Sequence, residues 1–155
     1  MDRTTNQVDW LYRTLLIIWA ACLVSHFLFL ILLYEVRPEV YQFGQAEPFL
    51  GDHYIIVIVA VIFGLEALIF SFFRHSKTLK RSVSEQDPEL VKAALIIALS
   101  YCLSVSLWGA FLAFEFHYSY FYLWILAGIL ATLYYFPRRT DLQAANYKIS
   151  GTNHN

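Results

Sequence analysis

Residues 54–73 read YIIVIVAVIFGLEALIFSFF, and Glu66 is the only charged side chain in this run. A helix needs roughly 20 predominantly apolar residues to cross the hydrocarbon core of a bilayer. The run lacks the alternation of polar and apolar side chains that a strand of a membrane barrel shows. Open strands leave backbone groups unpaired in lipid, whereas a helix pairs them internally. The stretch is therefore predicted to form a transmembrane helix.

Three further apolar runs of similar length occupy residues 14–34, 93–114 and 118–136. The whole chain is 59% hydrophobic and 15% charged, which is too apolar for an ordinary soluble domain. We predict an all-α fold, a four-helix transmembrane bundle that forms one domain over residues 1–139. Residues 140–155 are polar, include Gly151 and lack apolar periodicity, so they are expected to form a flexible cytoplasmic tail.

The basic residues predict the orientation of the four spans. Of the 11 Lys and Arg residues, all except Arg37 precede the first run, lie between the second and third, or follow the fourth. Segments on the cytoplasmic side of membrane proteins carry an excess of Lys and Arg. The chain is thus expected to be a multi-pass protein of the cell (inner) membrane, with both termini in the cytoplasm.

The two halves of the chain resemble each other, which favours an architecture of two tandem helical hairpins. A shift of 64 residues brings the segment that begins at His53 onto the segment that begins at His117 without a gap, and Gly64 then falls on Gly128. Repeated hairpins in parallel orientation are a known way to build membrane proteins. The alternative is that any two membrane hairpins share aromatic and basic ends. Small residues at helical spacing, such as Ser100 and Ser104, are expected to mark contacts between helices.

Pro88 and Glu89 lie just ahead of the third run, and Trp108-Gly109 lie toward its end. With these residues the run resembles the ion-binding helix of the rotor proteolipid, the c subunit, of F- and V-type ATP synthases. The chain also resembles four-span bacterial membrane proteins of unassigned function that end in Phe-Pro-Arg-Arg, here residues 136–139. The proteolipid carries a carboxylate ahead of its aromatic-Gly pair, and Leu103 occupies that position here. Leucine binds neither a proton nor a sodium ion, so the resemblance implies a packing style and no ion site.

Five polar residues inside the runs are candidates for a membrane-embedded site: Glu66, Tyr101, His26, Ser25 and Ser104. An intramembrane carboxylate is costly in lipid and marks a functional site by default. The structural alternative is a protonated Glu66 inside the bundle, hydrogen-bonded to Tyr101. For His26, a neutral hydrogen-bonded side chain between helices is the commoner case than a ligand.

The histidines also raise the question of a metal or haem site. His26, His53 and His117 are all predicted in the outer half of the bilayer, where a redox subunit would need them to converge. No close ligand spacing links them, so neither a metal nor another cofactor is predicted. The chain has no Gly-rich phosphate loop and no nucleophile-base pattern, which argues against an enzyme. Its net charge of −1 argues against nucleic acid as a partner.

Two functions from different classes stay open. The first is a non-enzymatic, proteolipid-like membrane protein with a structural, assembly or accessory role, whose partners are the lipid bilayer and other membrane subunits or further copies of itself. The alternative is translocation of a proton or cation, with Glu66 as the exchanging group. A dry and fully paired Glu66 favours the first function, and a water-accessible Glu66 favours the second.

Overall fold

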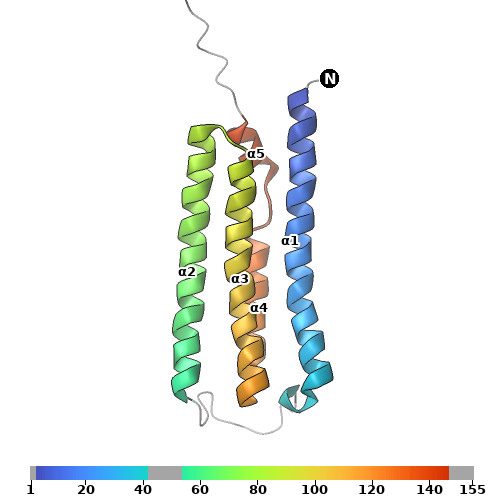
Figure 1. Cartoon of the computed structure of the whole chain (residues 1–155), viewed down its shortest axis with the longest axis vertical. Coiled ribbons are helices and arrows are strands. Elements are labelled where there is room, and N and C mark those ends of the chain that lie inside the picture. Colours follow the sequence, from blue (N-terminus) through green and yellow to red (C-terminus); the bar gives the residue numbers. More distant parts are fainter. Residues whose placement is uncertain (1–2, 42–53, 147–155) are drawn as a thin grey trace, which may run out of the picture.

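The computed structural model describes residues 3–41 and 54–146, and this part of the chain is helical without any strand (Figure 1). Its elements are α1 (Arg3–Val36), the 3-10 helix η1 (Pro38–Tyr41), α2 (Tyr54–Glu85), α3 (Glu89–Phe116), α4 (Phe121–Tyr134) and α5 (Arg139–Ala145). The all-α prediction is therefore confirmed. Among these helices α1, α2 and α3 are long and apolar enough to cross a membrane, whereas α4 is a shorter apolar helix.

Helices α1, α2, α3 and α4 run alternately in opposite directions (Figure 1). The start of α1, the turn between α2 and α3, and α5 all lie at one end of the bundle, which we call the α5 end. Helix η1 and the turn between α3 and α4 lie at the opposite end, which we call the η1 end. Arg81, Lys92 and Arg138 therefore lie toward the α5 end, and Arg37 lies at the η1 end.

Only the second of the two predicted hairpins is a packing unit. Helices α3 and α4 lie side by side and are joined by the short segment 117–120. Helix α1 packs against α3 and α4, while α2 packs against α3 from the other side, so α1 and α2 are separated (Figure 1). The long connection over residues 37–53 does not force α1 and α2 together, whereas the short segment after α3 forces α4 to fold back.

Helix α4 is shorter than the predicted span at 118–136 because both of its ends are interrupted. His117 has a φ of 54°, in the left-handed region, and the amide of Tyr118 donates to the carbonyl of Leu112 at 3.3 Å, which closes α3. At the other end Pro137 has no backbone N–H and disfavours a helical conformation at Phe136. The 14 residues of α4 extend over about 21 Å at 1.5 Å per residue.

The start of the predicted flexible tail is ordered as α5. Leu142 and Ala145, three residues apart on one face of this helix, have no exposed surface. They join a hydrophobic cluster with Leu11 of α1 and Val91 of α3, so α5 packs back on the bundle. The prediction of a tail that is flexible from residue 140 is thus wrong for α5, and residues 147–155 lie outside the described part of the chain.

Gly64 of α2 and Gly109 of α3 make room for Trp124 of α4. A Cβ atom at Gly64 would lie 2.4 Å from the Trp124 ring. A Cβ atom at Gly109 would lie 2.5 Å from the Trp124 Cβ and 2.9 Å from the carbonyl oxygen of Phe121. The backbones of α3 and α4 come close at Gly109, and close backbone approach favours the association of helices in lipid.

Candidate functional site

Glu66 lies on the outer face of α2. Its side chain is exposed, and the residues that share its helical face, Ile62, Ile69 and Phe73, are between 55% and 65% exposed. Gly64, which faces α4, precedes Glu66 by two residues, and this spacing rotates the carboxylate by about 200° around the helix axis. The carboxylate therefore points away from the bundle, into a surface that is otherwise apolar.

The predicted hydrogen bond between Glu66 and Tyr101 is not formed. Tyr101 is half-buried on α3, and neither side chain has a hydrogen-bond partner among residues 8–41 and 54–146. The rotation of α2 is the physical reason, because it turns Glu66 away from the helix that carries Tyr101. The structure thus separates the two residues that the sequence paired.

His26 is the polar centre of the bundle core. Its side chain has no exposed surface. Its Nδ1 lies 2.7 Å from the hydroxyl oxygen of Ser106 on α3, and its Nε2 lies 2.8 Å from the hydroxyl oxygen of Thr132 on α4. A neutral imidazole has one N–H donor and one acceptor nitrogen, so one hydroxyl accepts from the ring and the other donates to it. His26 thus links α1 to both α3 and α4.

Thr132 extends this network toward two further side chains of α1. Its backbone carbonyl accepts a hydrogen bond from the indole nitrogen of Trp19 at 2.8 Å. Its hydroxyl oxygen lies 3.9 Å from the sulfur of Cys22, which in turn lies 4.0 Å from His26 Nε2. Cys22 and Cys102 are both buried free thiols. The result is a polar cluster of His26, Ser106, Thr132 and Cys22 within an apolar core.

Gly128 makes room for this cluster. A Cβ atom at this position would lie 2.1 Å from the Ser106 hydroxyl oxygen and 3.0 Å from the Cε1 of His26. Any larger residue would therefore push the hydroxyl or the ring out of place. The sequence repeat aligned Gly128 with Gly64, and the structure shows that both are close-packing positions with different neighbours.

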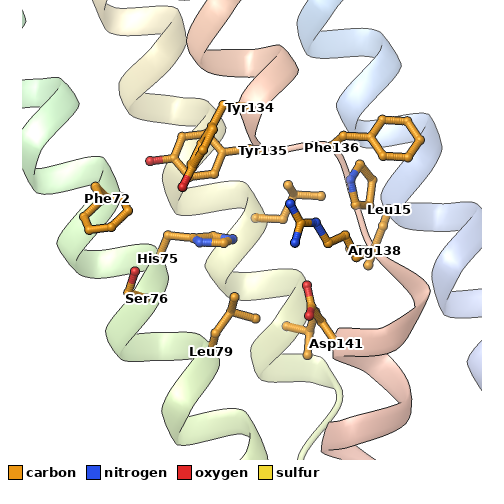
Figure 2. A pocket seen from close by; sticks show the side chains of 13 residues that line it. Leu15, Phe72, His75, Ser76, Leu79, Tyr134, Tyr135, Phe136, Arg138 and Asp141 are labelled. Carbon is orange, nitrogen blue, oxygen red and sulfur yellow. The ribbon is translucent and has the colours of Figure 1, made fainter.

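A second polar group lies between this cluster and the α5 end. The hydroxyl oxygen of Ser71 on α2 lies 3.0 Å from the hydroxyl of Tyr135 and 3.4 Å from the carbonyl oxygen of Ala98. The ring of Tyr135 packs against the ring of His75, with 4.8 Å between the centroids. His75 and Tyr135 border a pocket of about 330 Å³ at the α5 end (Figure 2).

The two candidate serines, Ser25 and Ser104, do not join the polar cluster. The hydroxyl of Ser25 donates to the carbonyl of Ala21, and that of Ser104 donates to the carbonyl of Ser100, each at 2.9 Å. These bonds satisfy the hydroxyls within their own helices. The contact face predicted at Ser100 and Ser104 is wrong, because both side chains are exposed.

His26 and His117 do not converge on one site. His117 is exposed at the η1 end, where its Nε2 lies 3.0 Å from the guanidinium of Arg37. Arg37 also pairs with Glu39 at 3.3 Å. The pKa of Glu39 is held below its usual value by a hydrogen bond from its own backbone amide and, further, by Arg37. His53 lies outside the described residues, and within them no three His, Cys, Asp or Glu side chains are placed to hold a metal ion.

Sequence analysis did not identify Ser106 and Thr132, which are the two hydrogen-bond partners of His26. A signal was present, because a buried imidazole needs a partner at each nitrogen. Thr132 is the only threonine in the apolar run 118–136, and Ser106 is a hydroxyl in the run 93–114. With both nitrogens bonded, His26 offers no free lone pair to a metal, and the arrangement serves to hold three helices in register.

Comparison of the chain with protein-family models, with curated proteins and with solved structures finds no match. The likeness of the third run to the rotor proteolipid therefore stays a prediction.

Proposed function

We propose that the chain is a four-span protein of the cell inner membrane, with both termini in the cytoplasm, and that it acts as a non-enzymatic, proteolipid-like subunit or accessory factor of a larger membrane complex. The membrane placement is supported by three helices of sufficient length and apolarity and by the apolar outer surface of the helices. The gathering of basic residues toward the α5 end supports a cytoplasmic location of that end.

Glu66 is exposed and unpaired within the bundle, so the criterion of a dry, paired carboxyl group is not met, and the accessory role rests instead on the cost of leaving this group in lipid. A carboxyl group in contact with lipid tails is costly, so intramembrane carboxyl groups normally face other protein or water. Here no described residue of the chain itself pairs with Glu66. A helix of another subunit, or of a second copy, that covers this face of α2 would remove Glu66 from lipid and supply a hydrogen-bond partner.

An apolar groove on another face of α2 offers a second contact surface for a neighbouring helix. It has a volume of about 200 Å³ and is lined by residues of α2, α3 and α4, including Leu65, Val105 and Trp124. The small residues Gly64 and Ala127 are part of its lining. A bulky side chain of a neighbouring helix would fit this groove, and Glu66 lies on a different face of α2, so covering both takes two contacts.

The alternative function is translocation of a proton or cation through Glu66, and the absence of an internal partner for this residue favours it as well. A carboxyl group that is held by no neighbour in its own bundle is free to gain and lose a proton when a second subunit or a water-filled path reaches it. The structural role for Glu66 that the sequence suggested, a hydrogen bond within the bundle, no longer competes with these two functions.

The test compares Glu66→Leu and Glu66→Gln with the wild type, after purification in a gentle detergent and mass spectrometry of the co-eluting proteins. We expect Glu66→Gln to keep the partner, because an amide still donates and accepts hydrogen bonds, and Glu66→Leu to lose it. The thermal stability of the isolated chain should not fall in either variant, because Glu66 is exposed. Glu115→Leu, which removes an exposed carboxylate at the end of α3, serves as the control.

One result would contradict the accessory role, and another would favour the alternative function. Unchanged co-elution or self-association of Glu66→Leu would show that no partner contacts this face. A Glu66→Gln variant that keeps its partners but no longer carries protons across reconstituted vesicles would promote the translocation function, because an amide cannot titrate.

A further inference from the structure

The pocket at the α5 end exists because α4 stops before its neighbours do. After Tyr134 the chain leaves the helix, passes Pro137 and returns as α5, while α2 continues to Glu85 and α3 begins at Glu89. The space left between these segments is a pocket of about 330 Å³ (Figure 2). This volume lies at the lower end of the range for small-molecule sites.

Two opposite charges line this pocket without pairing. The side chains of Arg138 and Asp141 point into it from the segment that follows α4 (Figure 2). Within the described part of the chain, neither forms a salt bridge with the other or with any other residue, although Asp141 acts electrostatically on His75. The neighbouring Arg139, by contrast, pairs with Asp9 of α1. The pocket thus presents a free cation and a free anion to a ligand.

The depth of the pocket in the proposed bilayer is that of the lipid headgroups. Leu15 at the start of the first apolar run, Phe72 at the end of the second and Tyr134 near the end of the fourth all line it. Phe72 is 49% exposed and Tyr134 is 64% exposed, so aromatic rings flank the opening. Aromatic residues concentrate at this level of membrane proteins, and pockets with basic residues between helices on this side bind lipid headgroups.

We propose that this pocket binds the headgroup of a zwitterionic phospholipid with a primary ammonium group, of the phosphatidylethanolamine class. Arg138 binds the phosphate through its guanidinium, and Asp141 accepts hydrogen bonds from the ammonium. The acyl chains leave the pocket past Phe72 and Tyr134 into the bilayer. The inference rests on the proposed membrane placement and is independent of any partner complex.

The presence of both charges distinguishes this ligand from other lipids. A headgroup with only negative charge gains the contact with Arg138 but is repelled by Asp141. A phosphatidylcholine headgroup carries a positive charge but has no N–H to donate, and its three methyl groups need more room. A phosphate with a primary ammonium satisfies both side chains with charge-assisted hydrogen bonds.

The test measures lipid binding to the detergent-purified full chain by native mass spectrometry, with phosphatidylethanolamine, phosphatidylcholine and phosphatidylglycerol of identical acyl chains. We expect phosphatidylethanolamine to bind more tightly than either other lipid by about tenfold, the factor that corresponds to one charge-assisted hydrogen bond. Equal affinities for the three lipids, or tighter binding of phosphatidylglycerol, would overturn the proposal on the wild-type chain alone.

Two variants assign the roles of the charged residues. Arg138→Gln should weaken the binding of phosphatidylethanolamine and that of phosphatidylglycerol alike, because both lipids contain the phosphate. Asp141→Asn should lower the affinity for phosphatidylethanolamine to that for phosphatidylcholine without weakening phosphatidylglycerol. Arg74→Gln, which removes an exposed basic residue of α2 that does not line the pocket, should change nothing. If Asp141→Asn leaves the lipid preference intact, the proposed ammonium contact is wrong.

A soluble headgroup separates failure of the lipid site from failure of the membrane placement. Glycerophosphoethanolamine carries both charges without acyl chains and should compete only weakly with the lipid. If it binds while phosphatidylethanolamine does not, the ligand is a soluble phosphate ester, which contradicts the lipid site and leaves the membrane placement to the labelling of introduced cysteines described below. If neither binds, the proposed site is wrong, and the membrane placement is then decided by the labelling of introduced cysteines described below.

Discussion

The hydroxyls of Ser106 and Thr132 allow an imidazole to sit in the middle of an apolar bundle. A buried ring nitrogen without a partner is destabilising, and His26 has a hydroxyl within 2.8 Å of each nitrogen. Gly128 is required beside them, because a methyl group there would overlap the Ser106 hydroxyl. The packing of these four residues on three helices is therefore interdependent, and a substitution at one is expected to displace the others.

Ser106 and Ser104 offer a matched pair for testing this dependence at the level of single residues. Ser106→Ala leaves the Nδ1 of His26 unpaired in the core, so it should lower the free energy of unfolding by about 0.6 to 2 kcal/mol, the range for hydrogen bonds between membrane helices. Ser104→Ala removes a hydroxyl that bonds only to its own helix and should be nearly neutral. Thermal unfolding in mild detergent measures both. Equal effects of the two variants would contradict a structural role for the His26 cluster.

The difference between His26 and Glu66 shows which features of a site can be predicted from an apolar sequence. A histidine among apolar residues has to find hydrogen bonds inside the bundle, and His26 does so. The direction in which Glu66 points depends on the rotation of α2 about its own axis. Apolar residues surround this helix on all sides, so no polar face reveals the rotation. The small Gly64, which faces Trp124, is the better marker of the inner face.

At the scale of helices, Trp124 packs against both Gly64 and Gly109, and the atoms that an added methyl group would meet can move aside at Gly64 but not at Gly109. A Cβ at Gly109 meets the Trp124 Cβ and the backbone oxygen of Phe121, neither of which can move without α4. Gly109→Ala should therefore destabilise by about 1 to 3 kcal/mol through overpacking, offset by at most about 1 kcal/mol from the higher helix propensity of alanine. Gly64→Ala meets the ring alone, and a shift of the ring makes it the milder change.

A second substitution distinguishes the two glycines. Trp124→Leu shortens the side chain that Gly64→Ala meets, so the double variant should recover much of the effect of Gly64→Ala. Combined with Gly109→Ala, Trp124→Leu should restore little of the lost stability, because the contact with the Phe121 carbonyl is unchanged. Stabilities of the single and double variants in detergent give the coupling energies. Equal recovery at both positions would contradict the close approach of α3 and α4.

The helices were predicted well where length and composition determine them. The arrangement of the helices was predicted less well where it depends on the connections between them. Three apolar runs became long helices because lipid-compatible backbone has few alternatives. The separation of α1 from α2 was not foreseeable, because the connection over residues 37–53 is long enough for several arrangements. The order of α5 was also missed, since its two buried residues, Leu142 and Ala145, give too short an apolar pattern to stand out.

For the whole molecule, the decisive question is whether α4 crosses the bilayer. Its 14 residues extend over about 21 Å, less than the roughly 30 Å of hydrocarbon. The helix nevertheless runs antiparallel to α3, from the η1 end to the α5 end (Figure 1). The non-helical segments 118–120 and 135–138 continue it on both sides, with Tyr118 and Tyr135 buried in protein, where irregular backbone is tolerated at membrane depth. In the proposed four-span topology, α5 lies on the same side of the bilayer as the α2–α3 turn.

Cysteine labelling on intact cells tests this topology at three positions. Single cysteines replace Ser84 at the end of α2, Gln143 on α5, or Gln45, which lies outside the described residues, in a background with Cys22→Ala and Cys102→Ala. Because basic residues gather at the α5 end, an impermeant thiol reagent should label position 45 and should reach positions 84 and 143 only after permeabilisation.

Labelling at 84 but not at 45 would show the opposite orientation. Labelling at both 45 and 143, with 84 protected, would show that α4 turns back and the chain has three spans. Labelling at all three would contradict the membrane placement itself, because no lipid barrier would then separate the two ends of the bundle.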